Sequence, residues 1–453
     1  MEILVINGSP KGKYSTTLQT DKYLEILHPE HNFAYLDAGM NIKQLEKDFS
    51  AAEEALIKAE LIIFSYPVYT FLVPCQLHRF IELMKSSGID FSDKYASQIS
   101  TSMHFYDITA HEFIRENALD MGFRYIKGLS AEMDDLTKEK GQKEARSFFD
   151  HLIWSIDNGL YEKSADSDVI KPNHVQVTAC ENITEKSGDI VIVADLAEDD
   201  IQLSNMIKRF KSACVKNTRT VNIHEFKFKG GCLNCFNCSK DGTCIYNDGF
   251  QELLRNTIQS AEAIVLAFSI KDHSMGSVFK TYDDRQFCNG HRTVTMGKPF
   301  GYIISGDISR EENLRTVINA RSEVGGNYLA GIASDESDPD REIDMLALNI
   351  AYAVDNGYTQ PADFYGVGGM KIFRDLIWLM QGVMRADHKF YKSHGQYDFP
   401  QKKTGKMLAM YAAGYMMNNK KLKAKIGSKL NDGMLASYSK VLENAAKESK
   451  KTH

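Results

Sequence analysis

Residues 3–17 read Ile3-Leu-Val-Ile-Asn-Gly-Ser-Pro-Lys-Gly-Lys-Tyr-Ser-Thr-Thr17, an apolar run that passes directly into a polar loop. Four apolar residues in succession predict a buried strand, and the residues from Leu18 to Leu27 predict a helix. A strand that leads through a glycine-containing loop into a helix is the opening unit of a parallel α/β sheet. This stretch therefore decides the fold class at the amino end of the chain.

The same alternation continues through the first 160 residues and is repeated after a polar join at about residues 160–187. In the first half we predict further strands at 61–64, 95–101 and 125–129, a helix that begins near Pro74 and another over 111–121. In the second half we predict strands at 190–193, 263–268 and 300–304. The predicted fold is therefore α/β, with two doubly wound parallel sheets in tandem over residues 1–160 and 186–358.

Composition places the chain among soluble proteins. It has 453 residues, 43% hydrophobic and 25% charged, with a net charge of -6, which argues against nucleic-acid binding. No apolar run approaches the ~20 residues that cross a bilayer, and Met1–Asn7 has no basic leader, so we expect a cytoplasmic protein. Residues 371–453 carry 17 Lys and Arg against 6 Asp and Glu, so residues 359–453 are expected to form a separate basic, helical segment.

The polar loop at residues 7–17 lies where parallel α/β proteins bind nucleotide phosphates, beside a helix amino terminus. Ser9, Ser15, Thr16 and Thr17 supply hydroxyl groups there, enough to surround a phosphomonoester. The order of residues is neither that of a P-loop nor G-x-G-x-x-G. The alternative interpretation is a simple strand-to-helix turn capped by a single hydroxyl.

Two paired motifs carry a resemblance to a known family. Gly8-Ser-Pro-Lys-Gly-x-x-Ser-x-Thr17 is followed by Ser65-Tyr-Pro-Val-Tyr-x-x-x-x-Pro-x-x-Leu-x-x-Phe80. Together they resemble the NADPH-dependent FMN reductase branch of the flavodoxin-like superfamily, well over residues 1–150 and more weakly over 186–340. The resemblance implies FMN, its phosphate held by Ser9, Lys11, Ser15, Thr16 and Thr17 and its ring beside Pro67, Val68 and Tyr69.

The segment at residues 100–107 ends the third predicted strand at the same edge. In the family this loop borders the flavin, so Ser102, Met103, His104 and Phe105 are candidates for cofactor contact, and His104 and Tyr106 for the catalytic delivery of a proton. Phe105 and Tyr106 could equally be packing residues of the loop. The corresponding loops of the second half, 194–200 and 270–273, are acidic or charged, so we predict one FMN per chain, in the first half.

Four of the eight cysteines lie within thirteen residues, as Gly231-Cys-Leu-Asn-Cys-Phe-Asn-Cys-Ser-Lys-Asp-Gly-Thr-Cys244. The pattern C-x2-C-x2-C-x5-C in one loop, with Gly242 to allow a turn, predicts that Cys232, Cys235, Cys238 and Cys244 hold one [4Fe–4S] cluster. Zinc and free thiols are the alternatives; structural zinc usually uses two separated pairs. Cys75, Cys180, Cys214 and Cys288 have no ligand spacing.

This loop also resembles that of the iron–sulfur flavoproteins, in which one domain normally bears both FMN and cluster and electrons cross between paired subunits. Here the flavin loop and the cysteines stand in different halves. We therefore expect the two halves to form an intrachain pseudo-dimer that places the cluster of the second half beside the flavin of the first.

These features predict an oxidoreductase that takes electrons from NAD(P)H or a reduced ferredoxin-like carrier, through FMN and the cluster, to a small-molecule or protein acceptor. NAD(P)H as a transient co-substrate is implied by the resemblance alone. The alternatives are a non-catalytic electron carrier and a redox or metal sensor that acts through a protein partner. A homodimer is left open. For the basic segment, packing on the acidic body is favoured over contact with a membrane surface.

Overall fold

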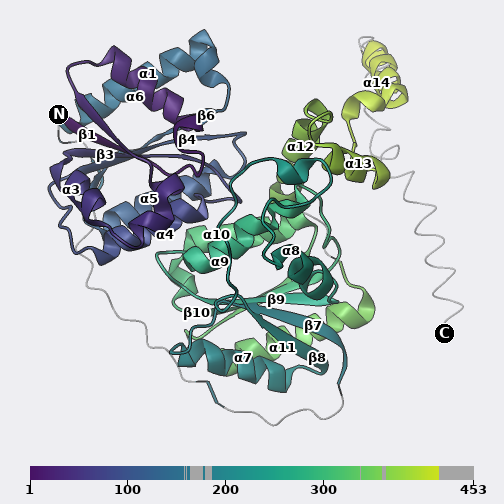
Figure 1. Ribbon diagram of the computed structural model, residues 1–453. Helices are drawn as coiled ribbons and strands as arrows, with labels where there is room; N and C mark the ends of the chain where they lie inside the picture. Colours follow the sequence, from purple (N-terminus) through teal and green to yellow (C-terminus); the bar gives the residue numbers. More distant parts are fainter. Residues whose placement is uncertain are drawn as a thin grey trace, which may run out of the picture. The chain divides into compact units, whose positions relative to one another are not determined.

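Two parallel β-sheets, each covered by helices on both faces, make up most of the computed structural model (Figure 1). The structure describes residues 1–157, 159, 161–163, 177–178, 186–336, 338–359 and 364–417. Most of the predicted polar join, Cys180 and the part of the basic segment beyond residue 417 lie outside the described residues. No helix among the described residues is long and apolar enough to cross a membrane.

The first sheet has the strand order β2-β1-β3-β4, with β5 and β6 both paired to β4, and every pairing is parallel. Its strands are β1 (Glu2–Asn7), β2 (Asn32–Leu36), β3 (Leu61–Pro67), β4 (Tyr95–Ser102), β5 (Arg124–Tyr125) and β6 (Leu129–Glu132). The single strand predicted at 125–129 is thus interrupted. The break lies beside Gly128, where a Cβ atom would overlap the carbonyl oxygen of Gln98.

The second sheet repeats this topology, in the order β11-β10-β9-β7-β8. Its strands are β7 (Ser187–Ala194), β8 (Lys216–Asn222), β9 (Ala263–Ser269), β10 (Pro299–Ser305) and β11 (Tyr328–Ser334). Counted within its own half, each sheet has the order 2-1-3-4-5, which is the flavodoxin-like arrangement. The predicted fold class, two doubly wound parallel sheets in tandem with additional helices, is confirmed.

Helices cover both faces of the sheets, and further helices follow them toward the carboxyl end of the chain. They are α1 (Thr17–Leu27), α2 (Ala38–Leu45), α3 (Ser50–Lys58), α4 (Cys75–Ser86), α5 (Asp107–Asp120), α6 (Glu139–Asp157), α7 (Ile201–Ala213), α8 (Phe250–Leu253), α9 (Gly276–Arg285), α10 (Glu312–Gly325), α11 (Pro339–Asn356), α12 (Phe364–Leu379), α13 (Arg385–Ser393) and α14 (Thr404–Met417). Figure 1 shows α1 and α6 on the outer face of the first sheet and α7 and α11 on the outer face of the second. The helices α4 and α5 of the first half pack against α9 and α10 of the second.

The apolar core has three layers, and the central layer belongs to both halves. It contains Phe80 and Phe113 from the first half and Phe279 and Tyr282 from the second, all buried. Because one continuous core joins the halves, Met1–Phe390 forms a single compact unit, and a second unit begins at Tyr391. Helix α12, which the sequence analysis assigned to the basic segment, lies in the first unit.

The two facing helices α4 and α9 also cap each other, each through an acidic side chain. Glu82 of α4 accepts hydrogen bonds from the backbone N–H and the hydroxyl of Ser277, at the start of α9, both at 2.9 Å. In return, Asp284 of α9 accepts one from the backbone N–H of Cys75, the first residue of α4, at 2.9 Å. Each acid lies where the unpaired N–H groups of a helix favour negative charge, so each half caps a helix of the other.

A charged histidine joins the halves at a further point. His273 lies between Asp120 of the first half, at 2.8 Å, and Glu311 of the second, at 2.9 Å. Although burial lowers it, hydrogen bonding to these two carboxylates raises the pKa of His273 to about 10. The pKa of Glu116, which faces the same group, is raised to about 7, mainly by burial.

We predict that the His273→Gln variant is less stable than the parent by about 1.5–3 kcal/mol near pH 6, since hydrogen bonds to charged groups are lost. The folded-state pKa of His273 is raised, so its contribution is complete below about pH 6.5 and disappears as the pH rises through about 10. The midpoints of denaturant unfolding of parent and variant should therefore converge between pH 6.5 and 10. The exposed His151, changed to Gln, is the control; a gap that stays constant over this range would contradict the assignment.

Candidate functional site

The loop between β1 and α1 is ordered by a buried asparagine. The Nδ2 group of Asn7 donates to the carbonyl of Gly12 at 3.0 Å and to Asp37 at 2.7 Å, and its Oδ1 accepts from the N–H of Ser9 at 3.2 Å. Helix α2 lies close against this loop, because a Cβ atom on Gly39 would overlap the carbonyl of Gly8. The loop is therefore a fixed cradle whose hydroxyl groups and Lys11 stand at the carboxyl edge of the sheet.

The loop between β3 and α4 is a tight turn with the same backbone as its counterpart in the second half. Tyr69 and Leu72 exchange backbone hydrogen bonds at 2.8 and 3.0 Å, and the two residues between them have positive φ angles, 47° and 69°. Lys271 and Ser274 do the same at 2.9 and 3.0 Å, around φ angles of 52° and 58°. The scaffold is shared, while the side chains are apolar in one half and charged in the other.

The loop after β4 gives different roles to its predicted residues. Phe105 packs on Phe71 of the neighbouring turn, with ring centroids 5.0 Å apart. His104 is exposed and its Nδ1 lies 2.8 Å from Asp107, while Tyr106 packs between Phe71 and Tyr365. Thr17 points away from the loop surface and shares a hydrogen bond of 2.6 Å with Thr101, so it supports the loop from beneath.

The cysteine loop follows β8 of the second half and is held at several points. Cys238 donates to the carbonyl of Phe287 at 3.1 Å, and the N–H of Cys244 donates to Gln251 at 2.8 Å. Gly242 has a φ angle of 84°, in the left-handed region, which confirms the predicted turn. Gly231 lies directly on Cys75 of the first half, where a Cβ atom would overlap the sulfur, so this loop reaches across to the other half.

One cavity of about 680 Å³ brings the two loops together. Fourteen of the predicted site residues line it: Ser9, Lys11, Ser15, Thr16, Pro67, Val68, Tyr69, Ser102, Met103, Phe105, Cys232, Cys235, Cys238 and Cys244. Thr17, His104 and Tyr106 are not among the lining residues. The ammonium group of Lys11 also lies 5.5 Å from the ring centre of Phe236, inside the cysteine loop, so the two loops meet directly.

Helix α9 holds both loops, a role that sequence reasoning missed. Lys280 is fully buried and forms an ion pair of 2.5 Å with the buried Asp284. Lys280 also donates to the carbonyl of Tyr69 at 2.9 Å, and Asp284 accepts from the hydroxyl of Thr70 at 2.7 Å. These bonds fix the aromatic turn of the first half from a helix of the second.

The next residue of α9 fixes the cysteine loop. Arg285 donates to the carbonyl of Gly230 at 2.9 Å and to both oxygens of Asp248, at 2.8 and 2.9 Å. Its guanidinium stacks over Tyr246, 4.5 Å from the ring centre. Because Gly230 and Tyr246 flank the cysteines, Arg285 closes the loop at its base.

Helix α12 contributes an apolar wall to the cavity. Phe373 contacts Phe105, with ring centroids 4.3 Å apart, and His291, at 4.6 Å. Leu376 and Met380 line the same region. Phe105, His291 and Phe373 therefore bring together three segments that are far apart in sequence. No local sequence pattern predicts these contacts.

As they stand, the four clustered cysteine sulfurs are not gathered closely enough to bind a single zinc ion. A zinc ion with Zn–S bonds of about 2.3 Å needs its sulfurs about 3.8 Å apart. Among the described residues, three groups place three possible ligand atoms within 4.8 Å of one another, and no cysteine belongs to any of them. A four-iron core separates its ligands more widely than one zinc ion does, so the cluster is the interpretation that metal analysis has to test.

Burial and neighbouring cations act in opposite directions on the charge that this loop can carry. Burial raises the pKa of Cys232 well above its usual range and that of Cys238 to about 11, so free thiols at these positions stay protonated at neutral pH. Arg255 donates to the carbonyl of Gly242 at 2.6 Å and Arg292 to that of Cys288 at 3.0 Å. These cations, with Arg285, would offset the negative charge that four thiolates bring to the loop.

The first-half lining also fits FMN. Hydroxyl groups of Ser9, Ser15 and Thr16 with the ammonium of Lys11 suit a phosphate, and the neighbouring Pro67–Tyr69 turn gives a flat ring an apolar surface. The cavity volume lies within the usual range for cofactor sites.

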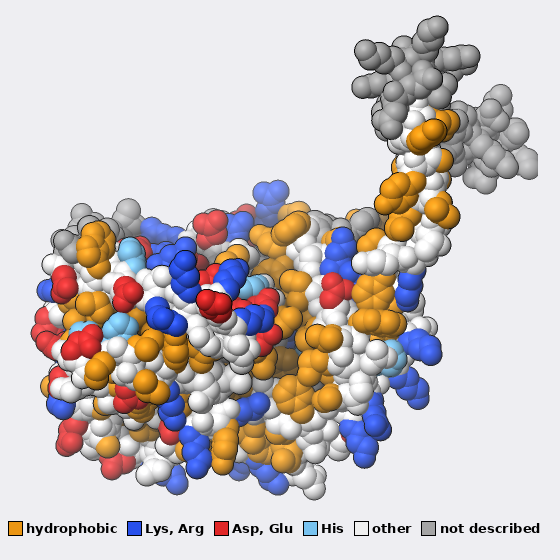
Figure 2. Space-filling model, turned by 90° about the horizontal axis from the view of Figure 1, so that it is seen from above, with side chains coloured by type: hydrophobic (Ala, Val, Ile, Leu, Met, Phe, Trp, Pro, Cys, Tyr) orange, Lys and Arg blue, Asp and Glu red, His pale blue; other side chains and the backbone are white. Residues whose placement is uncertain are grey.

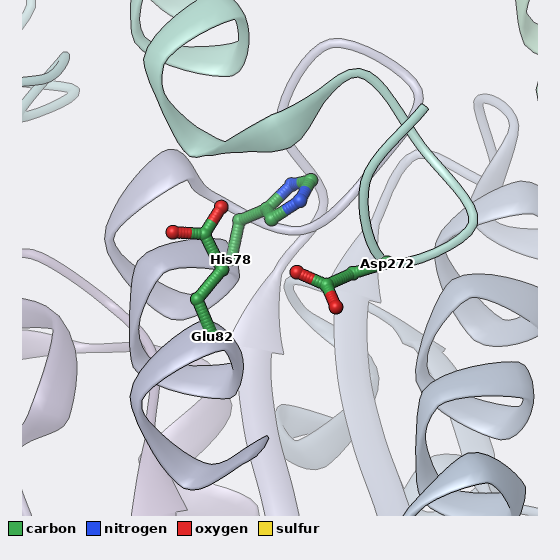
Figure 3. A group of neighbouring side chains, drawn as sticks. All are labelled: His78, Glu82 and Asp272. Atoms are coloured by element: carbon green, nitrogen blue, oxygen red, sulfur yellow. The ribbon is translucent and has the colours of Figure 1, made fainter. Parts of the chain in front are cut away.

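A second group of chemically suggestive residues lies between the halves (Figure 3). His78 and Glu82 of α4 approach Asp272, and both nitrogens of the buried His78 lack a hydrogen-bond partner. The pair His78–Glu82 has the spacing of Lys280–Asp284 in α9. Glu82 accepts hydrogen bonds from Ser277 and from Arg79, the latter at 2.8 Å, and Lys85 lies 3.1 Å from Asp272. Arg79 and Lys85 therefore already neutralise the carboxylates that a metal ion would need.

Comparison with known proteins agrees with the fold. A family model described as flavodoxin-like fold matches residues 1–129. No curated protein matches the chain. Similar solved structures include an NADH:FMN oxidoreductase in its apo form, 17% identical over 38% of this chain and 98% of that one, with a TM-score of 0.31.

Two further solved structures show the same low similarity. One is an NAD(P)H:quinone oxidoreductase from Methanothermobacter marburgensis, 14% identical over 32% of this chain and 92% of that one, with a TM-score of 0.27. The other is general stress protein 14 in complex with FMN from Treponema denticola, 14% identical over 35% of this chain and 99% of that one, with a TM-score of 0.28. At these values the fold of this chain rests on its own strand order.

We predict that the Lys280→Met variant loses about 3–5 kcal/mol of stability, because it leaves Asp284 buried without its counter-charge. Adding Asp284→Asn should recover part of this loss, since the uncompensated charge is then removed. Lys271→Met, which removes an exposed lysine near Glu82, should cost less than about 1 kcal/mol. Denaturant unfolding measures all three, and equal losses for the Lys280 and Lys271 variants would contradict a structural role for the buried pair.

Proposed function

We propose that this protein is an oxidoreductase that binds FMN in its first half and one [4Fe–4S] cluster in its second, and that it moves electrons between NAD(P)H or a reduced carrier and an acceptor. The single observation that carries the proposal is the shared cavity, which is lined both by the predicted phosphate and ring loops and by all four clustered cysteines. A reducing compartment such as the cytoplasm would keep these thiols available for iron.

Each part of the lining has a stated role in this proposal. Ser9, Lys11, Ser15 and Thr16 bind the phosphate, with Thr17 supporting their loop through Thr101. Pro67, Val68, Tyr69, Ser102, Met103 and Phe105 hold the ring, and Cys232, Cys235, Cys238 and Cys244 ligate the iron. When bound, FMN supplies the conversion between two-electron and one-electron transfer that a cluster beside it requires.

Tyr69 is the side chain that links the two cofactor regions. It belongs to the ring-binding turn, yet burial and the nearby Cys232 raise its pKa well above its usual range. Its ring also faces Phe287, whose carbonyl accepts from Cys238, with centroids 6.1 Å apart. Buried aromatic contact of this kind keeps water out of the space between flavin and cluster.

His104 keeps its proposed part in proton delivery, while Tyr106 is assigned the packing role that the sequence had left open. His104 is exposed and oriented by Asp107, so it can exchange protons with water at the edge of the ring loop. Tyr106 is packed among aromatic rings and orients the loop. The donor NAD(P)H is supported by the family resemblance and docks transiently in this proposal.

Anaerobically purified protein should contain about one FMN and four irons per chain, with flavin absorption peaks over a broad iron–sulfur background. Flavin peaks with no iron would contradict the second half of the proposal. Zinc in place of iron, by metal analysis, would do the same.

Cys235→Ser should abolish iron binding and leave the FMN content unchanged, because Cys235 is an exposed member of the cysteine loop and the phosphate cradle belongs to the other half. Cys214→Ala, which changes a buried cysteine away from the cavity, is the control and should keep both cofactors. Loss of FMN together with iron in the Cys235 variant would show that the two sites are not separate.

Steady-state oxidation of NADH and NADPH with ferricyanide or a quinone as acceptor distinguishes an enzyme from a carrier. We expect turnover that requires FMN. Full cofactor loading without any nicotinamide oxidation would favour a non-catalytic carrier that exchanges electrons with ferredoxin-like proteins.

A further inference from the structure

Helix α14 presents an apolar surface to solvent. Its sequence, Thr404-Gly-Lys-Met-Leu-Ala-Met-Tyr-Ala-Ala-Gly-Tyr-Met-Met417, contains a single charged residue. Large apolar side chains along it are exposed, including Leu408 at 68%, Tyr411 at 75% and Tyr415 at 82% (Figure 2). Exposure of this extent on consecutive turns needs a physical explanation.

The exposed apolar side chains are not confined to one stripe. At about 100° of rotation per residue, they are distributed around most of the helix circumference. They are Met407, Leu408, Met410, Tyr411, Tyr415 and Met416. A helix that is apolar on nearly all sides is normally covered by protein or by lipid, so α14 is a docking element.

Charge and length indicate which of these covers it. Lys402, Lys403 and Lys406 are exposed at the start of α14, and residues 371–453 as a whole have 17 Lys and Arg against 6 Asp and Glu. Such a surface attracts anionic headgroups, by about 1 kcal/mol for each basic residue close to them. The fourteen residues of α14 that the structure describes measure about 21 Å, less than the roughly 30 Å hydrocarbon core, so this described stretch is placed at the interface.

We propose that α14 binds the surface of an anionic lipid bilayer, with its Leu, Met and Tyr side chains at the headgroup–acyl boundary and its lysines on the headgroups. Tyr411 and Tyr415 have the amphipathic rings that this boundary favours. Packing of the basic segment on the acidic body, which the sequence analysis favoured, is the alternative that the vesicle experiment below decides. The proposal is independent of the redox function, because no residue of α14 lines the cavity.

The test is co-flotation of the full-length protein with vesicles of phosphatidylcholine alone or with 30% phosphatidylglycerol. We expect binding to the anionic vesicles that is at least tenfold stronger than to the neutral ones and that weakens in 0.5 M salt. Leu408→Glu should weaken it at least tenfold. Leu348→Glu, on α11, is the matched control, since Leu348 is 69% exposed, and it should bind as the parent does.

Charge is tested separately with Lys403→Glu/Lys406→Glu, for which we expect weaker binding to anionic vesicles only. An unchanged far-ultraviolet circular dichroism spectrum and thermal midpoint in each variant show that the first unit remains folded. The proposal is overturned if the parent does not float with anionic vesicles, or if the Leu408 and Leu348 variants bind equally. It is also overturned if the parent self-associates without lipid and Leu408→Glu abolishes this, because α14 would then serve as a contact between copies.

Discussion

The buried ion pair between Lys280 and Asp284 is the interaction on which the arrangement of the site depends. Burying two charges is costly unless each finds its partner and further hydrogen bonds. Here the partners lie in one helix, while the additional bonds go to Tyr69, Thr70 and Cys75 of the other half. The two charges have all of these hydrogen-bond partners only when the halves are packed together. The buried pair therefore fixes the position of the aromatic turn.

The facing helices show how a repeated scaffold has been made asymmetric. Glu82 and Asp284 cap each other's helices, and the turns that precede α4 and α9 have the same backbone. The side chains four residues before these acids differ, because α4 carries a neutral His78 where α9 carries Lys280. Lys280 holds the aromatic turn of the first half through the carbonyl of Tyr69, whereas the turn of the second half is held by other first-half residues, Asn117 and Lys85, which both contact Asp272 at 3.1 Å.

The interior strands could be predicted from the sequence, whereas three of the four sheet edges were missed and the fourth, at 125–129, was predicted as one strand where the structure has two. Runs such as Ile3–Ile6 and Ala263–Phe268 are buried on both faces, which makes them continuously apolar. The unpredicted strands β2, β8 and β11 are all sheet edges. In β8 (Lys216–Asn222) most side chains are polar and at least partly exposed. Val221 is the single apolar residue of β8, whereas β2 (NFAYL) and β11 (YLAGIAS) do contain apolar residues and differ from the interior strands in being less completely buried.

The same limit applies to the site. The cysteine spacing and the polar loop are local patterns, so both could be read from the sequence. Because each pattern is missing from the other half, the sequence also indicated that the two halves cooperate. Lys280, Asp284 and Arg285 resemble an ordinary solvated helix face, since nothing local distinguishes a buried charge from an exposed one. Their burial depends on contact with the first half, which is distant in sequence. Tyr69 and Lys280, for example, are more than two hundred residues apart. A homodimer built from one such domain would form this surface twice, whereas a tandem chain forms it once. One half can then carry the predicted phosphate and ring loops, and the other the cysteines.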